Sequence, residues 1–169
     1  MKKYGTVYKR ARSVNLVDGW LERYNEFKEF EPRTIDVLGI ENERLIMPNI
    51  GTDGEDYLPL AKCVFNSSKI ENGIEFTHNA VAQYFSILSS IFDFQKRLPD
   101  DELFLHDDLH ANNFVVFTNG KVILIDPDSF TTIKVPNKKY KYSHLHQMTH
   151  GFMTIMMGLQ RTYDSIGEK

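Results

Sequence analysis

The chain has 169 residues, a length that fits one domain with a hydrophobic core of its own. Its composition, with 41% hydrophobic and 25% charged residues, is that of a globular protein and excludes a disordered or fibrous one. The formal net charge of −3 excludes the strongly basic surface that draws proteins to nucleic acid or acidic membranes, so neither is an expected partner.

Cysteine usage and hydropathy indicate a cytoplasmic protein. Cys63 is the only cysteine in the sequence, so no disulfide can form within the chain, and no Cys/His spacing resembles a zinc finger. The basic residues at the start lack the apolar run of a signal peptide, and no stretch of about 18 apolar residues could span a membrane. Delivery into a host cytosol without a cleaved signal is compatible with this pattern.

The first part of the chain predicts a strand, a helix and a hairpin. Residues 3–11 are rich in β-branched and aromatic side chains with a rough period of two, the pattern of a half-buried strand. In residues 16–30 apolar side chains recur every three or four positions, which predicts a helix that ends before Pro32. Residues 34–51 then predict two short strands joined by a turn, the second of them at residues 44–47.

An exposed loop and a long helix come next. The loop at residues 51–56 is rich in glycine and acidic residues. From Thr77, a suitable N-cap, apolar residues recur at helical spacing to about Arg97, and we expect this largely hydrophobic helix at the centre of the fold. A last helix is expected over about residues 143–160, after a basic loop at 134–142. We expect its methionines to pack in the core, namely Met148, Met153, Met156 and Met157.

Residues 106–130, HDDLHANNFVVFTNGKVILIDPDSF, combine polar clusters with two apolar runs. Asn-Gly between the runs is a strong hairpin signal. A hairpin brings the residues before its first strand and those after its second strand to the same end, so we expect Asp108, Asn113 and Asp126 to converge. Two carboxylates and an amide oxygen are hard ligands that suit Mg²⁺, a metal that also binds substrate phosphates.

The spacing of these residues resembles that of a known superfamily. His106, Asp108 and Asn113 match the H-x-D-x-x-x-x-N catalytic loop of protein-kinase-like proteins. Asp126, eighteen residues after Asp108 and preceded by an apolar run, falls where that superfamily places its metal-binding aspartate. With His110 included, the loop HDDLHANN is more similar to the H-G-D-L-H-x-x-N form of aminoglycoside phosphotransferases and other bacterial kinase-like proteins than to the eukaryotic form.

The resemblance implies an ATP- and Mg²⁺-dependent phosphotransferase. Asp108 would be the base that accepts the proton of the substrate hydroxyl, while Asn113 and Asp126 would hold Mg²⁺ on the phosphates of ATP. His106 and His110 would support the catalytic loop on either side of Asp108.

The implied fold is α+β, a minimal bilobal protein-kinase-like domain over residues 1–169. Residues 1–50 would form a reduced N-lobe sheet and the hinge. Residues 51–169 would form a truncated helical C-lobe that carries the catalytic and metal-binding loops. The hinge residues that would offer backbone groups to adenine are Met47, Asn49 and Ile50.

The N-terminal segment can be matched to the family in two ways. In the first, Lys9 is that lysine and pairs with a glutamate of the following helix, with Glu26 as the main candidate and Glu22 and Glu29 as alternatives. In the second, YGTVYK is a remnant of the glycine-rich loop G-x-G-x-x-G-x-V. We favour Lys9, because a loop that cradles phosphate needs several glycines and this segment has only Gly5.

The expected acceptor is a protein hydroxyl, with host proteins among the candidates. Only 43 residues follow Asp126, which leaves little room for the helical insertions that enclose small molecules, and the DFG motif is replaced by Asp126-Pro127-Asp128. The alternatives are a small-molecule kinase, favoured by HDDLH, and a pseudokinase that binds a nucleotide or a partner, favoured by the incomplete glycine loop.

The same residues also have a structural explanation, a polar hairpin whose Asp and Asn side chains cap turns. Turn chemistry does not require separations of five and eighteen residues, so the three residues taken together favour catalysis. His106 and His110 could be zinc ligands, but zinc usually needs three or four nitrogen or sulfur ligands. We expect Asp107 in solvent and Asp128 in a turn.

Overall fold

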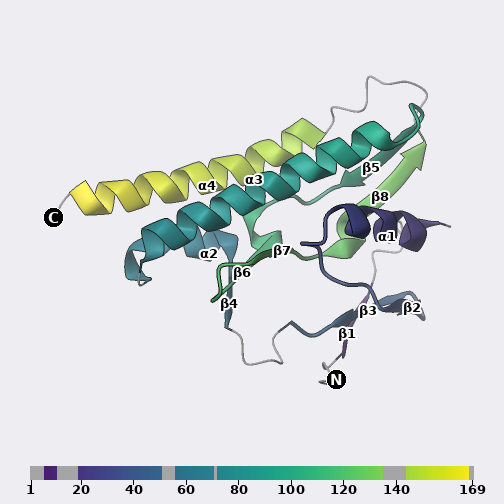
Figure 1. Cartoon of the computed structure of the whole chain (residues 1–169), viewed down its shortest axis with the longest axis horizontal. Helices are drawn as coiled ribbons and strands as arrows, with labels where there is room; N and C mark the ends of the chain where they lie inside the picture. Colours follow the sequence, from purple (N-terminus) through teal and green to yellow (C-terminus); the bar gives the residue numbers. More distant parts are fainter. Residues whose placement is uncertain (1–5, 11–18, 51–55, 71, 135–143, 168–169) are drawn as a thin grey trace.

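The computed structural model describes residues 6–10, 19–50, 56–70, 72–134 and 144–167, which form a mixed α+β fold (Figure 1). Its helices are α1 (Trp20–Phe30), α2 (Leu60–Phe65), α3 (Gly73–Arg97) and α4 (His144–Gly167). Its strands are β1 (Thr6–Arg10), β2 (Gly39–Glu41), β3 (Arg44–Pro48), β4 (Tyr57–Pro59), β5 (Glu102–His106), β6 (Phe114–Phe117), β7 (Val122–Leu124) and β8 (Phe130–Lys134). The α+β class expected from the sequence is confirmed.

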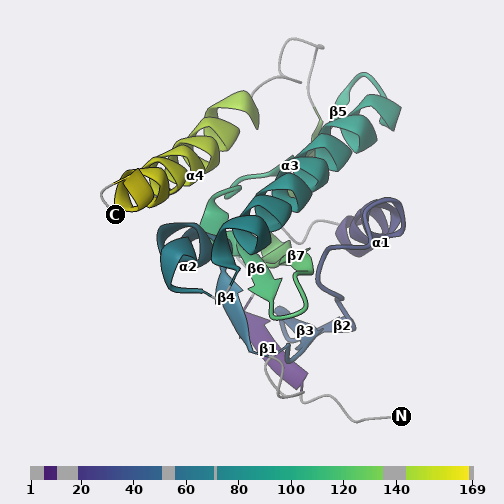
Figure 2. The same ribbon diagram turned by 60° about the vertical axis from the view of Figure 1, so that its left-hand side comes forward.

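The strands form small antiparallel sheets. β3 lies between β1 and β2, β6 lies between β4 and β7, and β5 pairs with β8. In both Figure 1 and Figure 2 the β1–β3–β2 sheet lies at the opposite end from the long helices α3 and α4, with β6 and β7 between them.

β2 and β3 form the first predicted hairpin. Its two turn residues, Asn42 and Glu43, have positive φ angles of 48° and 59°. Positive φ at both positions defines a type I′ turn, which matches the twist of the flanking strands. Across β3 from this hairpin lies β1, where Lys9 pairs with Leu45.

β6 and β7 form the second predicted hairpin. Phe117 N donates to Lys121 O at 2.9 Å, which leaves a loop of three residues that ends at Gly120. Gly120 has a φ of 81°, a conformation that glycine adopts without steric cost. A three-residue loop with its last residue left-handed is a common alternative to the two-residue turn.

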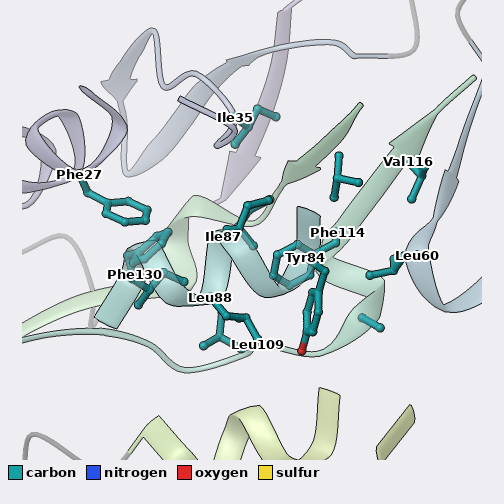
Figure 3. Packing of buried hydrophobic residues seen from close by; sticks show 14 of the residues in the cluster. Phe27, Ile35, Leu60, Tyr84, Ile87, Leu88, Leu109, Phe114, Val116 and Phe130 are labelled. Carbon is teal, nitrogen blue, oxygen red and sulfur yellow. The ribbon is translucent and has the colours of Figure 1, made fainter. Parts of the chain in front are cut away.

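α3 lies at the centre of the molecule, as expected. Its inward face is apolar, and Figure 3 shows Ile87 directed toward the strands. The rings of Tyr84 and Phe114 meet edge to face, with centroids 4.6 Å apart. The second hairpin therefore packs against this helix.

Glutamines on α3 complete the hydrogen bonding of neighbouring strands. Gln95 is buried; its Nε2 donates to Glu102 O at 2.9 Å and its Oε1 accepts from Phe104 N at 2.8 Å. Gln83 Nε2 donates to Gly120 O at 2.7 Å. Buried backbone groups need such partners, so α3 fixes both β5 and the β6–β7 loop.

α1 packs on β5 and β8 through aromatic side chains. Trp20, Tyr24 and Phe27 are buried, and Trp20 Nε1 donates to Phe130 O at 2.8 Å. The Phe27 ring lies 5.0 Å from that of Phe130, which stacks on Phe104 at 4.7 Å. Such aromatic clusters bury large apolar areas and fix ring orientation, so α1 is firmly joined to β5 and β8, and β5 leads directly into the loop at residues 107–113.

The segment after α1 is anchored to both α3 and β7. Glu31 is buried and accepts from Arg33 Nε and Nη2 at 2.7 and 2.6 Å, and Arg33 Nη2 also donates to Ser86 Oγ of α3 at 2.9 Å. Leu124 N donates to Arg33 O, and Leu124 O accepts from Ile35 N, both at 2.9 Å. The chain that leads into β2 therefore runs beside the strand that leads to Asp126.

The start of α3 differs from the prediction. The helix begins at Gly73, and Thr77 is a buried residue within it rather than its N-cap. Asn72 takes the left-handed conformation at the N-cap position. A Cβ at Gly73 would lie 1.9 Å from Ser67 O, so this tight entry into the helix requires glycine. β4, α2, β5 and β8 also have no counterpart among the predicted elements.

The methionines that the structure describes on α4 are exposed, so the prediction that they pack in the core is wrong. The exposed fractions are 51% for Met153, 46% for Met156 and 61% for Met157. α4 contacts α2 through another face, which contains the buried Ile155 and Gly158. A Cβ at Gly158 would lie 2.3 Å from Val64 Cγ1, so glycine permits this close approach.

Some expectations lie outside the residues that the structure describes. These are the ends of the first strand at residues 3–5 and 11, the start of the first helix at 16–18, the loop at 51–55, and the basic loop at 135–142, together with the side chains of Lys9 and Met148. Within the described part of the chain, no helix is long and apolar enough to cross a membrane.

Candidate functional site

The loop that follows β5 is anchored by His106. This histidine is the last residue of β5, has an exposed fraction of 1%, and meets the ring of Phe130 edge to face at 4.6 Å. Its Nδ1 accepts a hydrogen bond from Asp108 N at 3.2 Å. The buried ring thus fixes the path of the backbone at Asp108.

His110 holds the side chain of Asp108. His110 Nδ1 accepts from Asn112 N at 3.2 Å, so in the neutral ring the hydrogen is on Nε2. Nε2 lies 3.1 Å from Asp108 Oδ1, the distance of a hydrogen bond. Both side chains are about one third exposed, so the Asp108 carboxylate is accessible to solvent while His110 orients it.

Asn113 joins this loop to the second hairpin. Its exposed fraction is 9%, and its Nδ2 donates to Asp108 O at 2.7 Å. Its own backbone O accepts from Ile125 N at 2.8 Å. Asn113 therefore lies between the residue that precedes Asp126 and the backbone of Asp108.

Asp126 follows β7 with an unusual backbone conformation. Its φ of 72° and ψ of 54° lie in the left-handed region, which is uncommon for residues other than glycine and often marks a functional position. Ser129 Oγ donates to Asp126 Oδ2 at 2.6 Å, and Ser129 O accepts from Asp107 N at 2.9 Å. Asp126 is thus connected to the Asp108 loop through one residue.

The neighbouring aspartates differ in exposure. Asp107 is exposed, and Asp128 is buried in the short 3₁₀ turn Pro127–Ser129. Sequence reasoning missed Ser129 and Phe130 as parts of the site. The separation of three residues between Asp126 and Ser129 allows a side-chain hydrogen bond, but the same separation occurs in many ordinary turns and therefore does not single out Ser129.

The candidates for binding the ATP phosphates are only partly described. Lys9 lies on β1, opposite Leu45, and its side chain is outside the described part of the structure. The Glu26 side chain is 48% exposed and forms an ion pair with Arg23 of the same helix. Arg23 Nη2 also lies 2.7 Å from Oε1 of Glu102 on β5.

A cleft of about 300 Å³ surrounds the Arg23 ion pairs. Among the described residues it is lined by Gly19, Glu22, Arg23, Glu26, Glu102, Thr132 and Lys134. The cleft therefore includes Glu22 and Glu26, and it does not include Asp108, Asn113 or Asp126.

The proposed hinge residues follow the end of the first sheet. Met47 is buried and pairs with Val7 of β1. Asn49 and Ile50 come directly after β3 and are half-buried. Their backbone groups are therefore outside the β1–β3 ladder, unlike those of Met47.

The donor set at the hairpin end fits Mg²⁺ shared with a phosphate better than a metal held by the protein alone. Asp126 supplies a carboxylate and Asn113 an amide oxygen, both hard ligands. The described residues contain no group of three His, Cys, Asp or Glu side chains that could hold a metal ion. Mg²⁺ usually binds through one or two protein ligands together with phosphates and water, so two donors are sufficient for that use.

Comparisons with known proteins identify no relative of this chain. No protein-family model, no curated protein and no solved structure matches the chain. The molecule is an α+β protein with a polar site at the shared end of β6 and β7, formed by the loop of residues 106–113 and the turn of residues 126–129.

Proposed function

We propose that the protein is an ATP- and Mg²⁺-dependent phosphotransferase with a minimal protein-kinase-like fold. The observation that carries the proposal is the connection among three residues at one end of a hairpin. Asn113 Nδ2 bonds to Asp108 O at 2.7 Å, and Ser129 ties Asp126 to the residue before Asp108. A polar hairpin needs capped turns, but it does not need an accessible carboxylate held by a histidine.

Asp108 is the proposed base. His110 holds Oδ1, so the carboxylate presents Oδ2 in a defined direction toward an acceptor hydroxyl. Phosphoryl transfer depends chiefly on positioning and on neutralising charge, so the main contribution of Asp108 is to orient the hydroxyl and accept its proton.

Asn113 and Asp126 are the proposed ligands of Mg²⁺–ATP. When bound, Mg²⁺ neutralises charge on the phosphate oxygens. Lys9 is proposed to bind the phosphates with Glu26 as its partner, so Glu26 would have to exchange Arg23 for Lys9 when ATP binds. Backbone groups of the hinge are proposed to bind adenine, chiefly those of Asn49 and Ile50, because Met47 pairs with Val7 in the β1–β3 ladder.

The order and pairing of the elements support the finer fold assignment. β1, α1, β2 and β3 would form the N-lobe within residues 1–50, and the remaining elements would form the C-lobe within residues 51–169. β3 runs directly into the proposed hinge. β5 and β8 pair with each other, which brings His106 opposite Phe130 and closes the loop between them.

A protein hydroxyl is the proposed acceptor, in the cytoplasm or in a host cytosol. A small-molecule hydroxyl is the second candidate. The observation that favours it is the contact of His110 with Asp108, because His110 is the position at which HDDLH matches the aminoglycoside-phosphotransferase form rather than the eukaryotic form.

The experiment is transfer of label from γ-labelled ATP. The full chain is incubated with Mg²⁺, labelled ATP and a cell lysate separated into macromolecules and small molecules. We expect label in the macromolecular fraction, and its loss with Asp108→Ala or Asp126→Asn. Label confined to the small-molecule fraction would select the second acceptor class. Binding of Mg²⁺–ATP without any transfer would instead indicate a nucleotide-binding module.

A further inference from the structure

Ser129 joins the two halves of the proposed site. It has an exposed fraction of 0%. Its Oγ donates to Asp126 Oδ2 at 2.6 Å, its N donates to Asp126 O at 3.1 Å, and its O accepts from Asp107 N at 2.9 Å. One serine therefore contacts both the residue assigned to Mg²⁺ and the residue directly before the proposed base.

The bond to Asp126 acts on a torsion that the backbone does not determine. The terminal torsion of an aspartate has broad preferences, so the backbone alone does not set the plane of its carboxylate. The left-handed conformation of Asp126, which is unfavourable for residues other than glycine, sets only the direction in which the side chain leaves the chain. The hydroxyl of Ser129 then makes the two carboxylate oxygens inequivalent, because Oδ2 accepts its hydrogen bond.

The surroundings of Ser129 strengthen this bond. Pro127, Asp128 and Phe130 are buried together with Ser129, so the turn excludes solvent. Hydrogen bonds to an ionised carboxylate are stronger than neutral ones, and a low dielectric strengthens them further. Phe130 in turn contacts His106, so displacement of Ser129 would be opposed by the core.

From these contacts, and resting on the proposed function, we infer that Ser129 is a positioning residue for Mg²⁺–ATP: its hydroxyl orients the carboxylate of Asp126 toward the phosphates. Partners that hold metal-ligating groups typically contribute about 10–100-fold in metal affinity or activity. We therefore expect Ser129→Ala to raise the Mg²⁺ concentration needed for half-maximal ATP binding about 10–100-fold. The KM for the acceptor should remain nearly unchanged, because Ser129 is buried behind Asp126.

The test measures binding and needs no turnover. Thermal unfolding of the full chain is recorded against Mg²⁺ concentration with a non-hydrolysable ATP analogue, since a ligand that binds only the folded state raises its apparent stability. Ser129→Thr keeps the hydroxyl and should keep the wild-type Mg²⁺ midpoint, even where the added methyl lowers Tm. Ser129→Cys, with a similar volume and a weak donor, should give an intermediate midpoint and serves where Ser129→Ala does not fold.

Ser67→Ala is the matched control. Ser67 is also buried, and its Oγ donates to Val64 O at 3.2 Å in the turn after α2. Its replacement should lower Tm and leave the Mg²⁺ midpoint unchanged. If Ser129→Ala and Ser129→Cys both keep the wild-type midpoint, the positioning role is overturned while the proposed function stands. If wild type shows no Mg²⁺-dependent binding of the analogue, the proposed function and this inference both fall.

Discussion

The two histidines that flank Asp108 have different tasks, and their hydrogen bonds define them. In each ring Nδ1 accepts a backbone N–H, from Asp108 for His106 and from Asn112 for His110. His106 is buried against Phe130, whereas His110 Nε2 reaches Asp108 Oδ1. His106 therefore sets the path of the backbone, and His110 sets the orientation of the proposed base.

Replacement of His110 should impair turnover more than nucleotide binding. His110→Ala frees the Asp108 side chain to rotate, and a displacement of about 1 Å can cost about 100-fold in rate. We expect kcat for phosphotransfer to fall about 10–100-fold, with KM for ATP changed less than about threefold. His78→Ala is the control, because His78 is exposed and contacts Tyr163 on α4 instead. Steady-state kinetics with an unchanged kcat for His110→Ala would contradict this role.

Glu31 should make the stability of the fold depend on acid pH. Burial alone would raise its pKa, but hydrogen bonds from Arg33 and Ser90 and the charge of Arg33 together hold the pKa below its ordinary value. A carboxyl whose pKa is lowered by folding contributes stability that is complete above its unfolded pKa, about 4.3, and is lost as pH falls through the folded value.

The variant Glu31→Gln removes this titration. We expect it to lower the free energy of unfolding at neutral pH by about 1–3 kcal/mol, because hydrogen bonds to Arg33 are lost in a buried position. Its free energy of unfolding should also fall less steeply than that of wild type as pH decreases below about 4.3. Urea titrations from pH 3 to 7 check both points, and parallel curves for the two proteins would refute the assignment.

At the scale of elements, α3 does more than supply an apolar face. Gln95 hydrogen bonds to backbone groups of β5, and Gln83 hydrogen bonds to a backbone carbonyl in the loop of the β6–β7 hairpin. These are the two segments that carry His106 and lead to Asp126. The helix thus positions both sides of the candidate site by hydrogen bonds made from its own side chains.

Gln95→Leu should be clearly destabilising although leucine suits a buried helix position. It leaves Glu102 O and Phe104 N without their partner, and each unsatisfied buried group costs about 1–3 kcal/mol. We expect the free energy of unfolding, measured by urea denaturation, to fall by a corresponding amount. Gln160→Leu on α4 is the control, since Gln160 is exposed and bonds only to Asp164 among the contacts described. An equal effect of the two substitutions would argue against the role of Gln95.

Long patterns and turn chemistry could be read from the sequence, whereas short elements and the choice of packing face could not. The periodicity of α3 and the turns of both hairpins are local properties. β4 and α2 have three and six residues, too few for a period to stand out. The methionines show that α4 has apolar side chains outside its packed face, but its packing depends on Gly158 approaching Val64, a contact between distant segments.

The same division holds for the candidate site. Asp108, Asn113 and Asp126 could be selected because their separations are fixed and specific. Ser129 could not, because a separation of three residues from an aspartate occurs in many ordinary turns. Its importance depends on the left-handed backbone of Asp126 and on the contact with Asp107, and both are properties of the folded chain.

At the scale of the whole molecule, the segment after α1 connects the first sheet to the site. Arg33 hydrogen bonds to Ser86 of α3. Leu124 donates its N–H to Arg33 O and accepts from Ile35 N. Leu124 lies two residues before Asp126. In the proposed enzyme, this connection holds the part of the chain that contributes Lys9 and Glu26 in register with the part that holds Asp108 and Asp126.

The most direct measurement is Mg²⁺-dependent transfer from γ-labelled ATP by three single variants prepared in parallel: Asp107→Asn, Asp108→Asn and Asp126→Asn. Asp107 and Asp108 are adjacent, and Asp107 has the more exposed side chain. Comparing the two variants therefore distinguishes a specific catalytic role of Asp108 from a general effect of negative charge in this loop. The proposed function predicts near wild-type transfer for Asp107→Asn and its loss for the other two. No transfer by wild type with Mg²⁺ or Mn²⁺, or equal transfer by all three variants, would contradict it.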